Sequence, residues 1–117
     1  MNEADMKKRT KRFALDLIRL VSELPKSVEG RAIGGQLVGS GTSVGANYRA
    51  ACRGKSKADF IAKLGIVEEE ADESCYWLEL LIEGELAEKE RAELLLKEAN
   101  ERTAIIVSSR KTAGGVK

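Results

Sequence analysis

The sequence KADFIAKLGIVEEEADESCYWLELLIE, residues 57–83, decides the fold class. Its apolar side chains recur every three or four residues, which is the spacing of one buried stripe along an α-helix. The members of that stripe are Phe60, Leu64, Val67, Ala71, Cys75, Leu78 and Ile82. Ser56 precedes the stretch as a good N-cap, and Gly84 ends it. The stretch therefore predicts one helix over residues 57–83.

Three further stretches show the same helical spacing. They cover residues of about 5–24, 28–52 and 87–111. Pro25 ends the first, because proline disfavours a helical conformation in the residue before it. Gly54 is expected to cap the second in the left-handed conformation, and residues 112–117 are expected to fray. Four amphipathic helices with short connections predict an all-α, antiparallel up-and-down four-helix bundle, a single domain over residues 1–117.

The second stretch, residues 28–52, is rich in small residues. Its segment GSGTSVG, residues 39–45, resembles a dinucleotide-binding loop, but such a loop follows a β-strand and the sequence predicts none. Each glycine weakens a helix by about 1 kcal/mol relative to alanine, so this helix needs close neighbours. We therefore expect this helix and the helix at residues 57–83 to carry assembly and any function.

The chain contains no histidine. This excludes a Ser-His-Asp or Cys-His catalytic arrangement and the usual zinc sites. Helical bundles do build di-metal sites from glutamate and histidine. The acidic residues Glu69, Glu70 and Glu73 keep a carboxylate-metal enzyme as one alternative function, although no imidazole completes the set and a solvated acidic face explains them as well. We predict a non-enzymatic protein with no catalytic residue, no cofactor and no metal.

The two cysteines, Cys52 and Cys75, lie inside helical patterns and are expected to be reduced thiols. The first residues, MNEADMKKRTKR, are polar and do not resemble a signal peptide. No apolar stretch approaches the roughly 20 residues that span a membrane. These features predict a cytoplasmic protein without a membrane partner.

Positive charge is concentrated in the first half of the chain. Residues 1–57 carry 12 Lys and Arg against 5 Asp and Glu, whereas residues 58–117 carry 8 against 14. Nucleic-acid phosphates attract such basic clusters. One cluster is Lys7, Lys8, Arg9, Lys11 and Arg12, and we predict phosphate contacts from Arg49, Arg53, Lys55, Lys57 and Lys63. Solvated surface charge, or attraction between the two halves of the fold, explains the same pattern without a partner.

Tyr76 and Trp77 are adjacent, so their side chains point about 100° apart on a helix. An aromatic residue off the core face is often an interface anchor, although a broad core face would bury both. Together with Asn47 and Tyr48, they form the predicted oligomer or partner interface. The corresponding alternative function is a protein–protein adaptor that does not bind nucleic acid.

One set of residues carries a family resemblance. It consists of Gln36-Leu37, the run from Ser40 to Ala50, Ser56 with Phe60, Glu69-Glu70, Glu73 and Trp77-Leu78. The pattern resembles the four helix bundle protein family, whose members are encoded in intervening sequences of bacterial large-subunit ribosomal RNA genes and elsewhere in bacterial genomes. That family is related to the accessory variability protein of diversity-generating retroelements. Gly41 stands where alanine is usual, and Ala50 falls near a usual glutamate, which removes a carboxylate from the family's polar cluster.

The resemblance implies a ring of five bundles that works around RNA, DNA or a reverse transcriptase. Most members of the family have no established biochemical activity. Together with the basic clusters, the resemblance predicts a non-enzymatic, homo-oligomeric scaffold associated with nucleic acid. One specific form of this prediction is an accessory to a retroelement or its reverse transcriptase.

Overall fold

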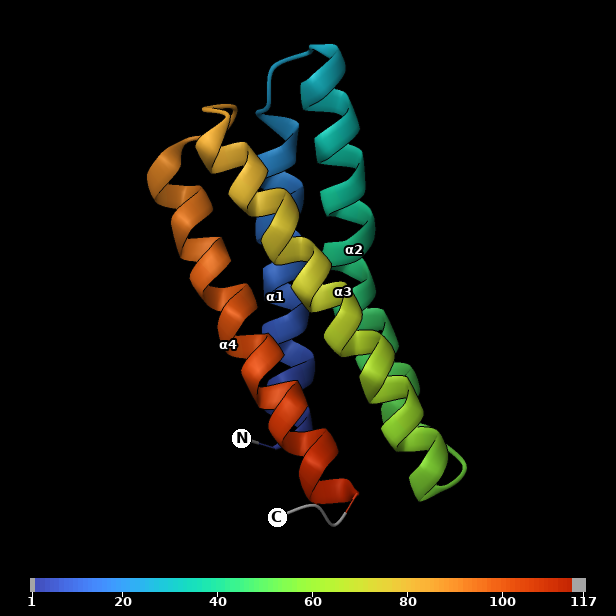
Figure 1. The fold of residues 1–117 in the computed structure, drawn as a ribbon. Helices are drawn as coiled ribbons and strands as arrows, with labels where there is room; N and C mark the ends of the chain where they lie inside the picture. The colour runs from blue at the N-terminus through green and yellow to red at the C-terminus, as the bar shows by residue number, and fades with distance from the viewer. Residues whose placement is uncertain (1, 115–117) are drawn as a thin grey trace.

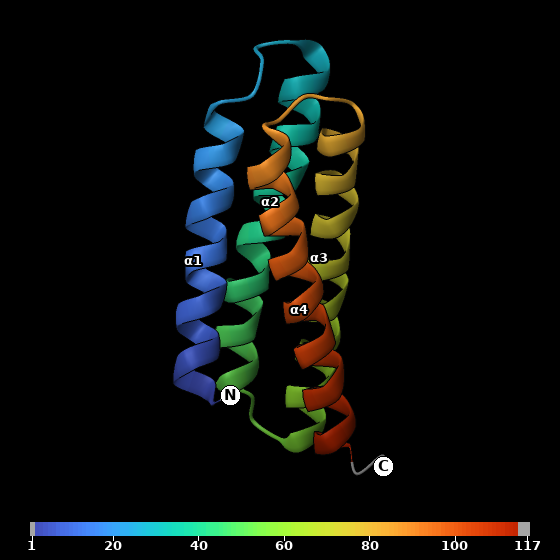
Figure 2. The ribbon, with the colours of Figure 1, turned by 90° about the vertical axis from the view of Figure 1, so that its left-hand side faces the viewer.

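Residues 2–114, which the computed structural model describes, form four α-helices joined by short turns. The helices are α1 (Glu3–Ser22), α2 (Val28–Cys52), α3 (Lys57–Glu83) and α4 (Lys89–Ala113), and the described residues contain no strand. Figures 1 and 2 show them running alternately up and down in a bundle of 45 × 23 × 20 Å. The predicted all-α up-and-down bundle is confirmed.

The helix ends depend on short polar residues and turn geometry. α1 begins at Glu3, two residues before the predicted start, because Oδ1 of Asn2 accepts a hydrogen bond from the Asp5 backbone N–H at 2.8 Å. Ser27 caps α2 and Ser56 caps α3 in the same way, each at 3.0 Å. α4 continues to Ala113, so the first residues of the expected tail are helical, and residues 115–117 lie outside the described part of the chain.

The prediction of a left-handed cap at Gly54 is wrong. α2 ends at Cys52, its C-cap Arg53 has a φ of −97°, and Gly54 has no positive φ. A Cβ at Gly54 would lie 3.0 Å from the Ala51 carbonyl oxygen, so space rather than backbone conformation favours glycine there. The residue that does adopt a positive φ, of 56°, is Glu85 in the turn after α3. Gly84 ends α3 as predicted and is its C-cap, with a φ of −83°.

α1 packs closely against the glycines of α2. A Cβ on Gly41 would lie 2.0 Å from Cδ1 of Leu17, and one on Gly45 would lie 3.1 Å from Oγ1 of Thr10. The expectation that this helix needs close neighbours is confirmed. In contrast, α1 and α4 pack together less extensively than the other neighbouring helices.

The core consists of two hydrophobic clusters stacked along the bundle. Four buried polar residues separate them, one from each helix: Thr10, Ser40, Ser74 and Arg102. The Ser74 hydroxyl lies 3.0 Å from the Ser40 hydroxyl, across α2 and α3. Nε of Arg102, whose side chain is 1% exposed, lies 3.2 Å from a carboxylate oxygen of Glu98. The stripes assigned from the sequence did not include Thr10, Ser74 or Arg102, so the polar middle of the core was not predicted.

Candidate nucleic-acid interface

A groove between α1 and α2 collects basic residues from both sequence clusters. We call it the α1/α2 groove. It encloses about 270 Å³ and is lined by Lys7, Thr10, Lys11, Ala14, Thr42, Gly45, Ala46 and Arg49. Figure 2 shows that the N-terminal half of α1 and the C-terminal half of α2 lie at the same end of the bundle. The antiparallel fold therefore brings the first basic cluster beside Arg49.

Small residues explain the shape of the groove. Gly45 and Ala46 present almost no side chain, and the close approach of Gly45 to Thr10 forms the floor. The Thr10 hydroxyl donates to the Met6 carbonyl oxygen at 2.9 Å, and the Thr42 hydroxyl donates to the Val38 carbonyl oxygen at 2.7 Å. Both hydroxyl hydrogens are used within the helices. Attraction for a ligand therefore comes from the cations on the rim.

The rim cations differ in how far they are neutralised. Nζ of Lys7 forms an ion pair with Glu3 at 2.9 Å. Lys11 and Arg49 are exposed and have no acidic partner in the described part of the chain. Two unpaired cations beside a third, on the rim of one groove, can hold a phosphate group.

The five predicted phosphate contacts lie at the same end of the bundle but do not form one site. Arg49 lines the α1/α2 groove, and Arg53, Lys55 and Lys57 are exposed around the turn from α2 to α3. Lys63 is half-buried on α3, where its Nζ lies 2.7 Å from Oδ2 of Asp59. That hydrogen bond, together with one from the Lys55 backbone N–H, holds the pKa of the Asp59 carboxyl below its usual value. Lys63 is therefore already paired.

Lys7 and Lys11 were seen as a basic cluster but were not chosen as site residues. Their spacing of four residues places both on one side of α1, and that signal was available in the sequence. The missing information was which side of α1 faces α2. The acidic residues gather toward the opposite end of the bundle, where residues 79–93 carry six glutamates against Lys89 and Arg91.

The predicted interface residues occupy three different environments. Tyr48 is 9% exposed and belongs to a core cluster, and burial raises its pKa above the usual value. Asn47 is half-buried, and its Nδ2 donates to the Ser43 carbonyl oxygen at 2.9 Å. Tyr76 is 54% exposed, and Trp77 is half-buried beside it. Of these four residues, Tyr76 presents the most surface to a partner.

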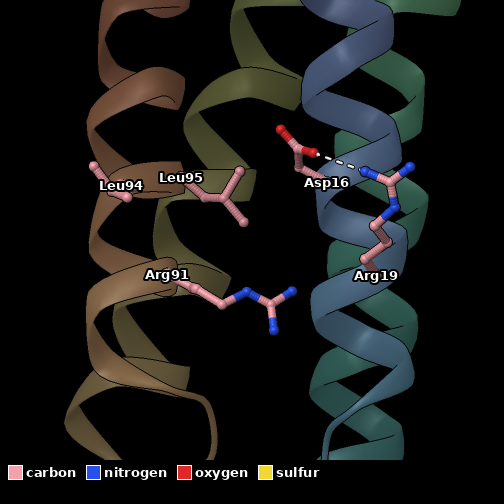
Figure 3. Close-up of a pocket in the computed structure, with 5 residues that line it drawn as sticks. All are labelled: Asp16, Arg19, Arg91, Leu94 and Leu95. Carbon is pink, nitrogen blue, oxygen red and sulfur yellow. Dashed lines mark hydrogen bonds and ion pairs between the residues drawn. The ribbon is translucent and has the colours of Figure 1, made fainter.

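A second groove lies between α1 and α4 and is shown in Figure 3. It encloses about 160 Å³ and is lined by Asp16, Arg19, Arg91, Leu94 and Leu95. Arg91 extends from α4 toward α1, and its guanidinium pairs with Glu23. Asp16 lies 3.4 Å from a guanidinium nitrogen of Arg19. Because each arginine here has a carboxylate partner, this groove is a weaker phosphate site than the α1/α2 groove.

The described residues contain no cluster of side chains that supports the alternative of a carboxylate-metal site. Glu69 and Glu73 are exposed and Glu70 is half-buried, and across residues 2–114 no three His, Cys, Asp or Glu side chains converge where they would share a metal ion. Cys52 and Cys75 are both free thiols. Among the described helices, none combines the length and apolar character needed to cross a membrane.

The comparisons with known proteins agree with the fold. The family model of the 23S rRNA-intervening sequence protein matches residues 2–108. The chain belongs to this family. A crystal structure of a protein of unknown function from the S23 ribosomal protein family of Bacteroides thetaiotaomicron is 36% identical, with a TM-score of 0.86. The alignment covers 95% of this chain and 99% of that one. The comparison with curated proteins gave no match.

Membership of the 23S rRNA-intervening sequence family confirms the predicted resemblance. It points to no catalytic activity, because neither the family description nor the solved relative names one. The description places the family's genes within ribosomal RNA sequence and says nothing of what the proteins bind.

Proposed function

We propose that this member of the family is a non-enzymatic, homo-oligomeric helical scaffold that holds nucleic acid by its phosphate backbone at the α1/α2 groove. The observation that carries the proposal is the convergence of Lys7, Lys11 and Arg49 on one groove. These residues come from separate basic clusters of the sequence, and the antiparallel packing of α1 and α2 brings them together. Arg53 and Lys55 extend the cationic surface toward the turn that follows α2.

The groove favours contact with phosphates over contact with bases. Lys11 and Arg49 are unneutralised in the described part of the chain, so a phosphate chain that displaces counterions gains free energy there. No aromatic residue lines the groove, and Tyr48, one position before Arg49, is buried in the core. Without stacking platforms, binding is expected to depend little on base sequence.

The homo-oligomeric part of the proposal is supported by the outer surface of α2. Residues 32–48 contain no charged side chain, yet Gly35 and Gly39 are exposed and a Cβ on either would meet no other atom within 4 Å. On α1, Leu15 and Ile18 are 42% and 45% exposed. Uncharged surface of this extent is typical of a face that another chain covers. A ring of five, and an accessory role beside a reverse transcriptase, are narrower forms of the proposal that rest on the sequence resemblance alone.

A mobility-shift titration at increasing salt tests the nucleic-acid part. The variant Lys11→Gln/Arg49→Gln removes two rim cations, and Arg31→Gln/Lys89→Gln removes two exposed cations elsewhere as a charge-matched control. Loss of two phosphate contacts should reduce the slope of log affinity against log salt by about 1.8 for duplex DNA and about 1.4 for single strands. Equal losses in both variants, or no binding of RNA or DNA at low salt, would overturn this part.

Sedimentation equilibrium tests the assembly part separately. The expected molar mass is that of a ring of five chains. A single chain at all protein concentrations would contradict the assembly part and would leave the phosphate contacts untouched.

A further inference from the structure

Tyr76 and Trp77 form an aromatic pair on the outside of α3. The ring of Tyr76, which is 54% exposed, meets the ring of Trp77 edge-on with 5.0 Å between the ring centroids. Nε1 of Trp77 donates to Oε1 of Glu73 at 3.2 Å. A large aromatic side chain has only two torsion angles, so an exposed tyrosine loses little side-chain entropy when a partner covers it. The pair therefore has the properties of a binding anchor.

Carboxylates surround Tyr76 along the helix. Asp72, Glu73 and Glu79 are its neighbours at three or four residues, and Glu69 and Glu83 lie one turn further in each direction. All five are exposed, and none forms an ion pair with a lysine or arginine in the described part of the chain. We call these five carboxylates, with Tyr76 and Trp77, the acidic aromatic face.

The acidic aromatic face is unfavourable for α3 alone. Glu69 and Glu73, and likewise Glu79 and Glu83, are like charges four residues apart, and such pairs repel on a helix surface. Glu79 and Glu83 also lie near the C-terminal end of α3, where the helix dipole favours cations, and the last turn contains no basic residue. An arrangement that destabilises its own helix and exposes an aromatic ring indicates a surface used for binding.

We propose that the acidic aromatic face docks a cationic protein segment that carries arginine. An arginine guanidinium can stack on the exposed ring of Tyr76 while it pairs with the carboxylates beside it. Nucleic acid and anionic lipid do not fit, because five unneutralised carboxylates repel phosphate. The chain's own basic clusters, within residues 7–12 and 49–57, lie toward the opposite end of the bundle. A second copy that placed those clusters on this face would make a head-to-tail contact, the type that builds rings, so self-association of Tyr76→Ala is measured beside peptide binding.

The single tryptophan of the sequence allows a direct test. A short arginine-rich helical peptide and a counterpart with glutamine at each arginine are titrated into the full chain. Binding is followed by Trp77 fluorescence and by calorimetry. The arginine peptide should bind at low salt, and the glutamine peptide should not. Tyr76→Ala should weaken binding about tenfold or more, whereas Tyr76→Phe, which keeps the ring, should bind nearly as well as the wild type.

A matched pair of charge variants separates this face from general attraction between opposite charges. Glu79→Gln/Glu83→Gln removes two carboxylates beside Tyr76, and Glu90→Gln/Glu93→Gln removes two exposed carboxylates from α4. Only the first should weaken binding substantially. Equal effects of the two variants, full binding by Tyr76→Ala, or no binding of the arginine peptide would overturn the proposal. Self-association that Tyr76→Ala abolishes and the peptide displaces would also overturn it, because the occupant would then be a second copy.

Discussion

A carboxylate oxygen of Glu98 lies 3.2 Å from Nε of Arg102, and the other carboxylate oxygen lies 3.7 Å from Nη2 of Arg9. Glu98 therefore links a buried arginine of α4 to an arginine of α1. These are the two neighbouring helices that pack together least extensively. Burial lowers the pKa of Arg102 and Glu98 opposes this, so the carboxylate compensates part of the cost of placing a charge inside the bundle.

The first prediction concerns this carboxylate. Glu98→Ala should lower the free energy of unfolding by about 2 kcal/mol, less than for a fully buried pair because Glu98 keeps contact with water. Glu93→Ala, at an exposed position of the same helix, is the control and should change it by less than about 0.5 kcal/mol. Arg102→Met, which removes the buried charge itself, should cost less than Glu98→Ala. Urea unfolding measures all three. An effect of Glu98→Ala no larger than that of Glu93→Ala would show that the pair contributes little.

The second prediction uses two glycines of α2 that differ only in their surroundings. Gly41→Ala should destabilise the protein by about 1–2 kcal/mol, because its Cβ would lie 2.0 Å from Cδ1 of Leu17. Gly39→Ala should stabilise the isolated chain by about 0.5–1 kcal/mol, because alanine favours the helix and the site is open within one chain. Thermal unfolding at several protein concentrations measures both. A loss at Gly39→Ala that grows with concentration would instead place this glycine in a contact between chains.

The sequence was sufficient to predict the four helices but not the contacts that their side chains make with one another. The spacing of Leu64, Val67 and Leu78 predicted α3, and all three are buried. Arg102 lies three residues after Ala99 and four before Ile106, both buried, so its position on the stripe was visible in the sequence. A charged residue at such a position is usually exposed, and only the structure shows Glu98 beside it.

The candidate site was partly predictable for a similar reason. The charge pattern identified Arg49 and its basic neighbours, but helical spacing does not say which neighbouring helix a surface residue faces. The packing of Gly45 on Thr10 determines that Lys7 and Lys11 lie beside Arg49. The sequence also did not show which cations form ion pairs. Lys63 differs from the exposed cations because it is paired with Asp59.

The third prediction is a pH dependence that comes from Cys75. Burial, with Asp72 and Glu79 nearby, raises the pKa of this thiol from 9.0 to about 11. Between these two values the unfolded chain releases the proton while the folded chain keeps it, so stability falls as pH rises through that range. Cys75→Ala should flatten the fall between about pH 9 and pH 10.5. Urea unfolding of both proteins in this range gives the difference between their free energies of unfolding. Tyr48, whose pKa is also raised by burial, is present in both proteins, so its contribution to the pH dependence cancels in this difference. Parallel curves for the two proteins would contradict a raised pKa at Cys75.

The fourth prediction separates two of the predicted phosphate contacts. Arg49 is exposed on the α1/α2 groove without an acidic partner in the described part of the chain, whereas Lys63 is paired with Asp59 at 2.7 Å. Arg49→Gln should reduce the salt slope of nucleic-acid binding by about 0.7–0.9, the share of one phosphate contact. Asp59→Asn/Lys63→Gln removes an ion pair without changing the net charge, and it should leave both affinity and slope unchanged. Mobility shifts at several salt concentrations measure both variants. If the second variant loses as much slope as the first, Lys63 leaves its carboxylate to contact phosphate, and the cationic surface extends from α2 onto α3.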